Sequence, residues 1–481
     1  MGPMRASMVG IDISPRFHPE YGARGTTPRM TKLHRPLLAR VLVLDQDDRQ
    51  LIWYGGDLNG EPLPFTDALR DELAGRLGVP RSQIAWSSSQ SHACAALPGS
   101  VMSGSHIENL VAANPEFIES ERQRFFDDLV SAARQAIETL QPVRLSAGCG
   151  FCDSIGYNSR FPMPAGGCKF SRDWAEGVQG GKFYDPTIGL LRFEDFHGNP
   201  LGAIFNFCCH PAVLIMQEQV SPDWVGAARQ CIEEALEGAP AMFVQGFCGD
   251  VHPRHMFGTS EQADRLGQRL GKAAVKALPT LTPVRCDPFD FGWRTIQLPC
   301  QSMPTRQECE DQIALREAYI EEVLKYDPQA SWCAGFNFPD SGRFSPEMRA
   351  AAARLAVVYF EEAIRLLEAG EEPRTQLDIT LGGLRLGDVG AAFSPGENFT
   401  ITGDRVRKRS PFTHTLICGD TNGLFGYMGT DEEIDRGGFE TDIFWKCLEF
   451  EGLRLPPAKG TADRVTAVLG ELLSELHGVQ S

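Results

Sequence analysis

Residues 203–211 of the chain read AIFNFCCHP. This run is short and apolar, and it ends where His210 meets Pro211. Such a run is typical of a buried β-strand that leads into a loop. Because α/β enzymes gather their reactive groups at strand ends, His210 is the first candidate for a functional residue.

Runs of the same kind occur along the rest of the chain and alternate with amphipathic helical patterns. The expected strands cover residues 37–44, 51–55, 84–88, 143–147, 188–193, 203–209, 241–245, 289–298, 377–386, 391–393 and 412–418. The expected helices cover residues 65–77, 119–140, 225–237, 261–278, 306–325, 346–367 and 461–477. This alternation indicates an α/β fold, which we expect to consist of central mixed β-sheets flanked by helices.

Residues 1–481 are expected to form a single composite domain, because neither an internal repeat nor a low-complexity linker divides them. The helices expected between residues 300 and 372 suggest a helical lobe inserted into this domain. The pattern also changes after Pro283, so a domain boundary near residue 285 is the alternative.

Composition and charge restrict the classes of function. With 42% hydrophobic and 23% charged residues, the chain has the composition of a globular protein. Its net charge of −17 argues against nucleic acid as a partner, because binding to phosphates requires Lys and Arg. We expect a cytoplasmic protein without a stable membrane anchor, since we find neither a signal peptide nor a run of about 20 apolar residues. The expected partner is a small-molecule substrate, and a homo-oligomer is left open.

Three further polar residues follow expected strands in the same way as His210. His92 comes shortly after an apolar run, Glu397 follows a strand and a Pro-Gly turn, and Tyr427 ends the glycine-rich loop 421–427. These residues are far apart in the sequence and form no local zinc motif such as HExxH, so any metal site must be assembled by the fold. Taken alone, each also has a structural interpretation, as a hydrogen-bonded histidine, a turn glutamate or a core tyrosine.

The order of the motifs around these residues resembles the catalytic domain of the neutral/alkaline, non-lysosomal ceramidases. The matching blocks are GIDISP at 10–15 for GxxDITxP, LARVLVL at 38–44 for RARAxVL, SSSQSHACAALPG at 87–99 for THTHSGPG, CHP at 209–211 for xxHP, SPDWVG at 221–226 for SxDFPG, FCGDVHP at 247–253 for NxGDVSPN, SPGE at 394–397 for VPGE and GYMGTDEE at 426–433 for xYITTxEE. The resemblance covers most of the chain. An immunoglobulin-like domain often follows in this family, and we expect it to be absent because the chain ends near Ser481.

The resemblance implies one Zn²⁺ per chain, bound by His92, His210, Glu397 and Tyr427. Two neutral imidazoles and one carboxylate leave such a metal electrophilic enough to lower the pKa of a bound water to about 7. The phenol of Tyr427 is then either a weak fourth ligand or a movable hydrogen-bond donor with a catalytic role.

Several positions depart from the family pattern. His252 stands where the family has a serine near the metal, which excludes a serine nucleophile, and we expect it to act as a general acid or base or else to be a loop histidine. Cys94 replaces the second histidine of THTHSGPG, and Phe439 replaces a tyrosine that resembles an oxyanion donor. Both replacements are expected to lie beside the substrate and to change the chemistry or the substrate.

A further segment, YNSRFP at residues 157–162, resembles the family loop NxNRSPxxY. The resemblance implies that Asn158 and Arg160 orient the substrate, with Arg160 binding an oxyanion or a carboxylate. A structural salt bridge is the alternative for Arg160.

These observations lead to three hypotheses about function. The first is zinc-dependent hydrolysis of an amide bond in a soluble small molecule, by metal-activated water. The second keeps the zinc but assigns ester or lactone hydrolysis, or a metal-assisted lyase or isomerase step on a polar metabolite. The third, a catalytically silent protein that binds zinc or a ligand, is motivated by the missing serine and tyrosine.

Overall fold

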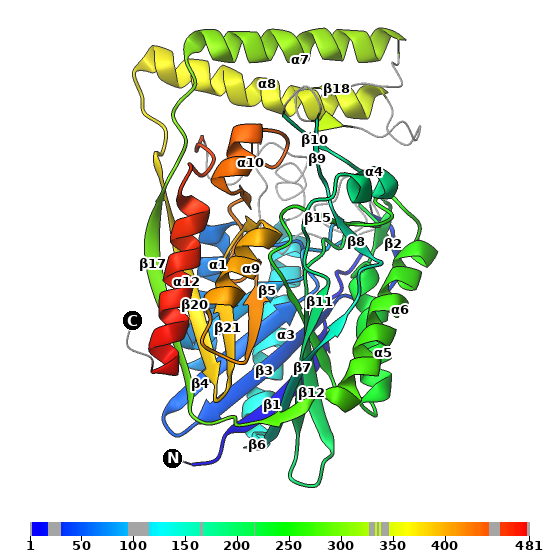
Figure 1. The fold of residues 1–481 in the computed structure, drawn as a ribbon, viewed down its shortest axis with the longest axis vertical. Helices are drawn as coiled ribbons and strands as arrows, with labels where there is room; N and C mark the ends of the chain where they lie inside the picture. The colour runs from blue at the N-terminus through cyan, green and yellow to red at the C-terminus, as the bar shows by residue number, and fades with distance from the viewer. Residues whose placement is uncertain are drawn as a thin grey trace.

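Three mixed β-sheets form the centre of the molecule in the computed structural model, which describes residues 2–17, 30–94, 115–163, 167–215, 217–326, 332–333, 336–337, 346–441 and 453–478 (Figure 1). The first sheet has the order β5 (Ile84–Ser88), β4 (Arg49–Gly56), β3 (Leu38–Gln46), β1 (Arg5–Asp12) and β6 (Gln141–Pro142). The second has the order β14 (Ala241–Gln245), β12 (Pro200–Phe207), β11 (Thr187–Glu194), β7 (Arg144–Phe151) and β16 (Thr282–Val284). The third has the order β17 (Phe289–Pro299), β20 (Gln376–Leu386), β21 (Val389–Phe393) and β23 (His414–Cys418).

Each sheet is antiparallel except at one edge, where a parallel strand is added. β5 is parallel to β4, β14 to β12, and β23 to β21. These parallel edge strands meet inside the molecule, since β14 contacts both β5 and β23. Their carboxyl ends are therefore brought to one place, as the carboxyl ends of parallel strands are in other α/β proteins.

Helices cover the outer faces of the sheets. α3 (Pro115–Glu138) packs on β1 and β3, α5 (Trp224–Ala235) packs on β14, α6 (Ser260–Ala277) packs on β7, and α12 (Thr461–His477) packs on β20. α1 (Leu63–Leu77) lies against β5 and α3. The helices and sheets thus bury separate apolar clusters on their facing surfaces.

A further apolar cluster lies between the three sheets and draws residues from all of them. Trp53 of β4 meets Phe393 of β21 edge to face, with ring centroids 4.9 Å apart, and Val244 and Leu384 belong to the same cluster. An aromatic pair of this kind contributes about 0.5–1.5 kcal/mol beyond the area that it buries. Residues on both sides of position 285 share this core, and the organisation as a single composite domain stays a prediction.

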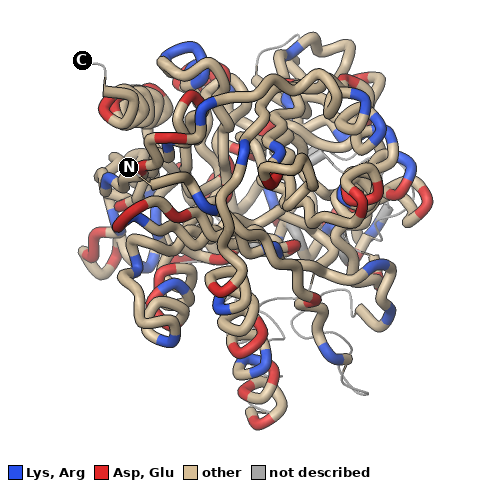
Figure 2. Tube along the Cα trace, turned by 90° about the horizontal axis from the view of Figure 1, so that it is seen from below, with Lys and Arg blue, Asp and Glu red and all other residues tan. Residues whose placement is uncertain are grey.

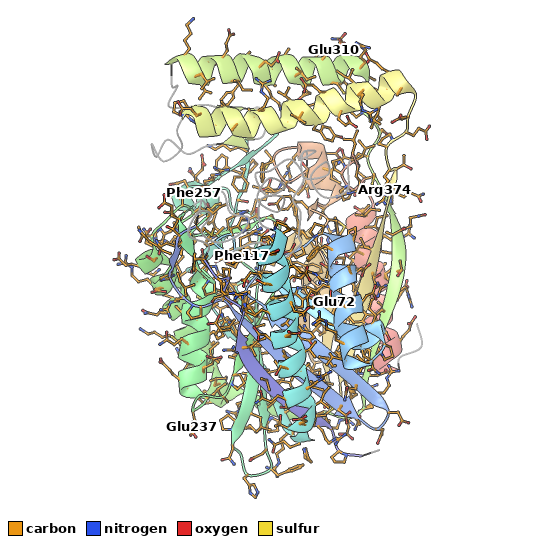
Figure 3. All side chains as sticks on the ribbon, turned by 180° about the vertical axis from the view of Figure 1, so that it is seen from behind. Glu72, Phe117, Glu237, Phe257, Glu310 and Arg374 are labelled. Carbon is orange, nitrogen blue, oxygen red and sulfur yellow. The ribbon has the colours of Figure 1, made fainter. Side chains whose placement is uncertain are left out.

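α7 (Arg306–Tyr326) and α8 (Pro346–Ala369) lie side by side across one end of the molecule, within the lobe expected at residues 300–372 (Figures 1 and 3). Tyr319 and Val323 of α7 and Val357 of α8 pack against Phe170 and Phe257. Figure 3 shows Glu310 on the outer helix of this pair and Glu237 near the opposite end of the molecule. The helix pair thus covers the end at which β10 (Cys168–Phe170) lies.

The expected strands and helices correspond closely to the observed elements, and the α/β architecture of mixed sheets with flanking helices is confirmed. The sequence interpretation missed α9 (Thr400–Arg409). Its buried face is formed by Thr400, Thr402, Gly403 and Val406, so the helix has almost no apolar periodicity to detect. Two short helices of six residues each, α4 (Trp174–Gln179) and α10 (Asp431–Arg436), were missed because they are too short for periodicity.

The surface carries charges of both signs. Lys and Arg alternate with Asp and Glu along the helices visible in Figure 2, rather than gathering on separate faces in that view. In the described part of the chain, no helix combines the length and the apolar character needed to cross a bilayer.

Candidate active site

Five polar side chains follow the carboxyl ends of strands that belong to all three sheets. They are His92 after β5, His210 after β12, His252 after β14, Glu397 after β21 and Tyr427 after β23. Because the parallel edge strands meet, the loops that carry these residues converge at one end of the core. The structure therefore brings together all four predicted zinc ligands and the predicted proton-transfer histidine.

Gln245, the last residue of β14, ties two of these loops together. Its buried amide nitrogen donates to the carbonyl oxygens of Ser89, at 2.9 Å, and Cys209, at 3.0 Å. The backbone N–H of His92 also donates to the carbonyl of the residue after His210, at 3.0 Å. These bonds satisfy buried backbone groups and hold the two imidazole rings with their centroids 5.5 Å apart.

Glu397 and Tyr427 are positioned by a short parallel pair, β22 (Glu397–Asn398) with β24 (Tyr427–Met428). Gly249 comes so close that a Cβ atom there would lie 2.3 Å from the carbonyl oxygen of Glu397. Only glycine permits this approach, and the Gly249 N–H donates to the Asn398 carbonyl at 2.9 Å. The turn that carries His252 is thereby packed directly against the strand that carries Glu397.

The hydrogen bonds of His92 and His210 fix which ring nitrogen carries the proton. Nδ1 of His210 lies 2.9 Å from the Val251 carbonyl oxygen, and Nδ1 of His92 lies 2.9 Å from the Gln90 carbonyl oxygen. A carbonyl oxygen only accepts, so each Nδ1 is the protonated donor and each neutral ring keeps its lone pair on Nε2. Metal-binding histidines are commonly oriented in this way.

The lone pairs of His210 and Glu397 lie close enough together to bind a cation. Nε2 of His210 lies 3.1 Å from a carboxylate oxygen of Glu397, and both side chains are fully buried. With the His210 proton on Nδ1, the lone pair of Nε2 faces a lone pair of the Glu397 carboxylate. A proton on Nε2, or a metal ion bound by both atoms, would relieve the repulsion. His92, His210, Glu397 and Tyr427 are thus chemically suited to Zn²⁺, which prefers imidazole and carboxylate ligands.

Among the described residues, no three His, Cys, Asp or Glu side chains already form a metal-binding group. Binding of zinc by these residues therefore stays a prediction. Tyr427 is hydrogen-bonded to Glu397, and burial together with the Glu397 charge raises the pKa of its phenol above the usual value. The phenol is thus protonated and serves as a donor to Glu397.

His252 lies directly beside the predicted ligands. Its ring is stacked on that of His210, with centroids 4.3 Å apart and planes 7° from parallel, and it meets Phe170 edge to face at 4.7 Å. Burial lowers the pKa of the imidazole, and the positive charges of His210 and His92 when protonated lower it further. His252 is therefore neutral near pH 7 and can accept a proton.

Arg160 and Asn158 make contacts within the protein that differ from the expected contact with substrate. The Arg160 guanidinium is 1% exposed and donates to Glu433, at 2.6 Å, and to Glu440, at 2.7 Å. Burial by itself would lower the pKa of Arg160, but the Glu440 and Glu433 charges outweigh burial and raise it. Asn158 donates to the carboxylate of Asp250 at 2.7 Å. These bonds favour the structural ion pair for Arg160 and a supporting role for Asn158.

Cys94 and Phe439 occupy different surroundings. The half-buried Cys94 packs against the apolar cluster beneath α1 and α3, and its thiol donates to the Ser91 carbonyl at 3.1 Å. Phe439 lies among the site residues, with its ring centroid 6.1 Å from that of Tyr427 and 5.0 Å from that of Phe170. Phe439 and Phe170 thus give the site an apolar wall.

Two residues in contact with the site were not identified from the sequence. Ser159 lies between Asn158 and Arg160 in the YNSRFP segment, and its hydroxyl lies 3.1 Å from Nδ1 of His252. Glu440 follows Phe439 and lies 3.1 Å from the same hydroxyl. The resemblance of YNSRFP to a family loop marked the segment but not the serine, and no motif marked Glu440.

Comparison with known proteins supports the resemblance at the level of fold. No family model and no curated protein matches the sequence. The structure is similar to that of neutral ceramidase from Pseudomonas aeruginosa, with a TM-score of 0.66 and 18% identity over 99% of this chain and 75% of that one. It is also similar to a ceramidase complexed with C2, with a TM-score of 0.67 and 18% identity over 100% and 76% of the two chains. The ceramidase-like fold expected from the motifs is thus confirmed.

Proposed function

We propose that the protein is a zinc-dependent hydrolase that cleaves an amide bond in a small molecule. The observation that carries the proposal is the convergence of His92, His210, Glu397 and Tyr427 at the strand ends, with both imidazoles presenting Nε2. The ceramidase fold of the solved structures that it resembles agrees with amide hydrolysis. Zn²⁺, when bound, would polarise the carbonyl group and lower the pKa of a coordinated water.

His252 is proposed to carry the proton that the reaction moves. As the oxygen of water bonds to the carbonyl carbon, Nε2 of His252 accepts one of its protons. The same proton then passes to the amide nitrogen as the C–N bond breaks, which leaves a carboxylic acid and an amine. The tight stacking on His210 supports this role, since it keeps the ring beside the predicted ligands with little freedom to turn.

Ester or lactone hydrolysis is the second candidate. Phe439 stands near Tyr427 at the position where the family resemblance leads one to expect a second phenol, so the site has one fewer donor for a developing oxyanion. Loss of such a donor typically costs about 10²–10³ in rate. A more reactive ester tolerates this loss better than an amide does.

The test combines metal analysis with turnover of matched amide and ester substrates. The two substrates carry the same acyl group and differ in whether it is bonded to nitrogen or to oxygen. The proposal predicts about one zinc per chain and hydrolysis that stops in His210→Ala and in the presence of a chelator. His197→Ala, at an exposed turn, is the matched control and should keep both zinc and activity. Turnover of esters alone would favour the second candidate, and zinc without turnover would indicate a silent binding protein.

A further inference from the structure

A buried chain of hydrogen bonds leads away from the proposed proton carrier. Nδ1 of His252 lies 3.1 Å from the Ser159 hydroxyl, which lies 3.1 Å from one carboxylate oxygen of Glu440. The other carboxylate oxygen of Glu440 accepts from Arg160 at 2.7 Å. Ser159, Glu440 and His252 are all at most 3% exposed. The pairing of His252 with Tyr157 in the antiparallel strands β15 (Val251–Pro253) and β8 (Gly156–Asn158) places the ring beside Ser159.

The direction of these bonds follows from the groups that can only accept. The single hydroxyl proton of Ser159 has two such acceptors within reach, the Glu440 carboxylate and the Asp250 carbonyl at 3.3 Å. With either acceptor the hydroxyl proton points away from His252, so the Ser159 oxygen accepts from Nδ1–H of His252. The ring is then held with the lone pair on Nε2, as it is in His92 and His210.

We propose that Ser159 and Glu440 are positioning residues that hold His252 in the tautomer able to accept a proton at Nε2. The inference rests on the proposed hydrolase function, in which His252 moves the proton. Burial raises the pKa of Glu440, and the Arg160 charge opposes that rise. Glu440 acts through Ser159, because its carboxylate, paired with Arg160, accepts from the hydroxyl and thus keeps the hydroxyl oxygen as an acceptor toward His252. Arg160 completes the chain by pairing with the outer oxygen of Glu440.

A purely structural role for the same bonds makes a different prediction. Glu433 and Glu440 both pair with Arg160, but Ser159 contacts only Glu440 of these two. Glu433→Gln therefore removes the charge of one buried partner of Arg160 while Glu440, Ser159 and the bond to His252 keep their contacts. It is the matched control for a general loss of packing around the ion pair.

The first test measures the tautomer of His252 in the protein labelled with ¹⁵N-histidine, by long-range ¹H–¹⁵N correlation. The His252 signal is identified as the one that is lost in His252→Gln. We expect a protonated Nδ1 in the wild type and in Glu433→Gln. In Ser159→Ala, which deletes only a hydroxyl, we expect a mixture of both tautomers. A protonated Nε2 in the wild type, or an unchanged tautomer in Ser159→Ala, would overturn the inference.

The second test is a double-variant cycle on hydrolysis. Ser159→Ala is expected to lower kcat at least about tenfold with KM changed less than about twofold, because a wrong tautomer affects the chemical step. In a His252→Ala background the same substitution should have no further effect. Losses that multiply in the double variant would show that Ser159 acts independently of His252. If His252→Ala kept full activity, the proposed function would fail at that residue, and the tautomer measurement would still decide the inference.

Discussion

Among single residues, His252 allows the proposed proton transfer to be tested separately from the predicted metal binding. It stacks on His210 while its Nδ1 is directed to Ser159, so its removal should leave the four predicted ligands in place. We expect His252→Ala to lower kcat by about 10²–10⁴, the usual contribution of a general acid–base group, while the zinc content stays the same. Steady-state kinetics with metal analysis of the same samples checks this. Full activity in the variant would remove His252 from the mechanism.

A variant of Arg160 distinguishes a structural ion pair from a contact with substrate. Replacing Arg160 with Ala leaves Glu440 buried without its guanidinium partner, whereas Glu433 keeps Lys182 and Arg436, so we expect the free energy of unfolding to fall by about 3–5 kcal/mol. Arg285→Ala, which breaks the exposed pair with Asp388, is the control and should leave the free energy of unfolding almost unchanged. Urea unfolding of both variants gives the comparison. An Arg160 variant of normal stability whose KM rises sharply would instead indicate contact with substrate.

Sequence reasoning identified most residues of the site but not their partners. His92, His210, Glu397 and Tyr427 could be predicted because strand ends and motif order mark them. Ser159 and Glu440 could not be, since a serine beside an arginine and a glutamate in a loop are common in any chain. Their role depends on distances between segments that are far apart in the sequence, and only the fold determines those distances.

At the scale of elements, α5 begins at a carboxylate that should make stability depend on pH. Asp223 accepts from the N–H groups of Leu214 and Trp224, both at 2.7 Å, and is completely buried. Burial raises the pKa of Asp223 to about 7, although these backbone donors oppose the rise. The folded protein therefore favours the protonated acid. Its contribution to stability is complete below about pH 4 and is lost as the pH rises through 7.

Asp223→Asn tests this dependence because the amide does not titrate. Measured by urea unfolding, the stability of the wild type relative to the variant should fall by about 3 kcal/mol between pH 5 and pH 8. The variant should also be less stable at both pH values, since its NH₂ group must face one of the two backbone N–H donors. The same pH dependence in both proteins would contradict the expected role of Asp223.

The elements that could be predicted are those that bury apolar side chains. The runs 84–88, 203–209 and 241–245 are apolar along their length, and each became a buried strand or most of one. α9 buries threonines and a glycine against the sheet instead, so neither its existence nor its place after Glu397 could be inferred from hydrophobic pattern. Tertiary packing, rather than local preference, determines that helix.

At the scale of the whole molecule, the arrangement of three sheets explains why the site needs the complete fold. Each sheet contributes one parallel edge strand, and these strands pack around a shared core that includes Trp53, Val244 and Phe393. The candidate ligands come from all three sheets. Motif order could predict which residues belong to the site. The pairing of distant strands within a sheet, such as that of β17 with β20, was not predicted.

The prediction that the proposed mechanism requires first is the binding of one zinc ion by His92, His210, Glu397 and Tyr427 together. It is tested most directly by a crystal structure of the full-length protein with anomalous diffraction recorded on both sides of the zinc absorption edge. We expect a single strong anomalous peak within about 2.0–2.2 Å of Nε2 of both histidines and of a Glu397 oxygen, with the Tyr427 hydroxyl beside it. A protein that turns over substrate without such a peak, or with its zinc bound elsewhere, would show that these four residues are not the zinc ligands.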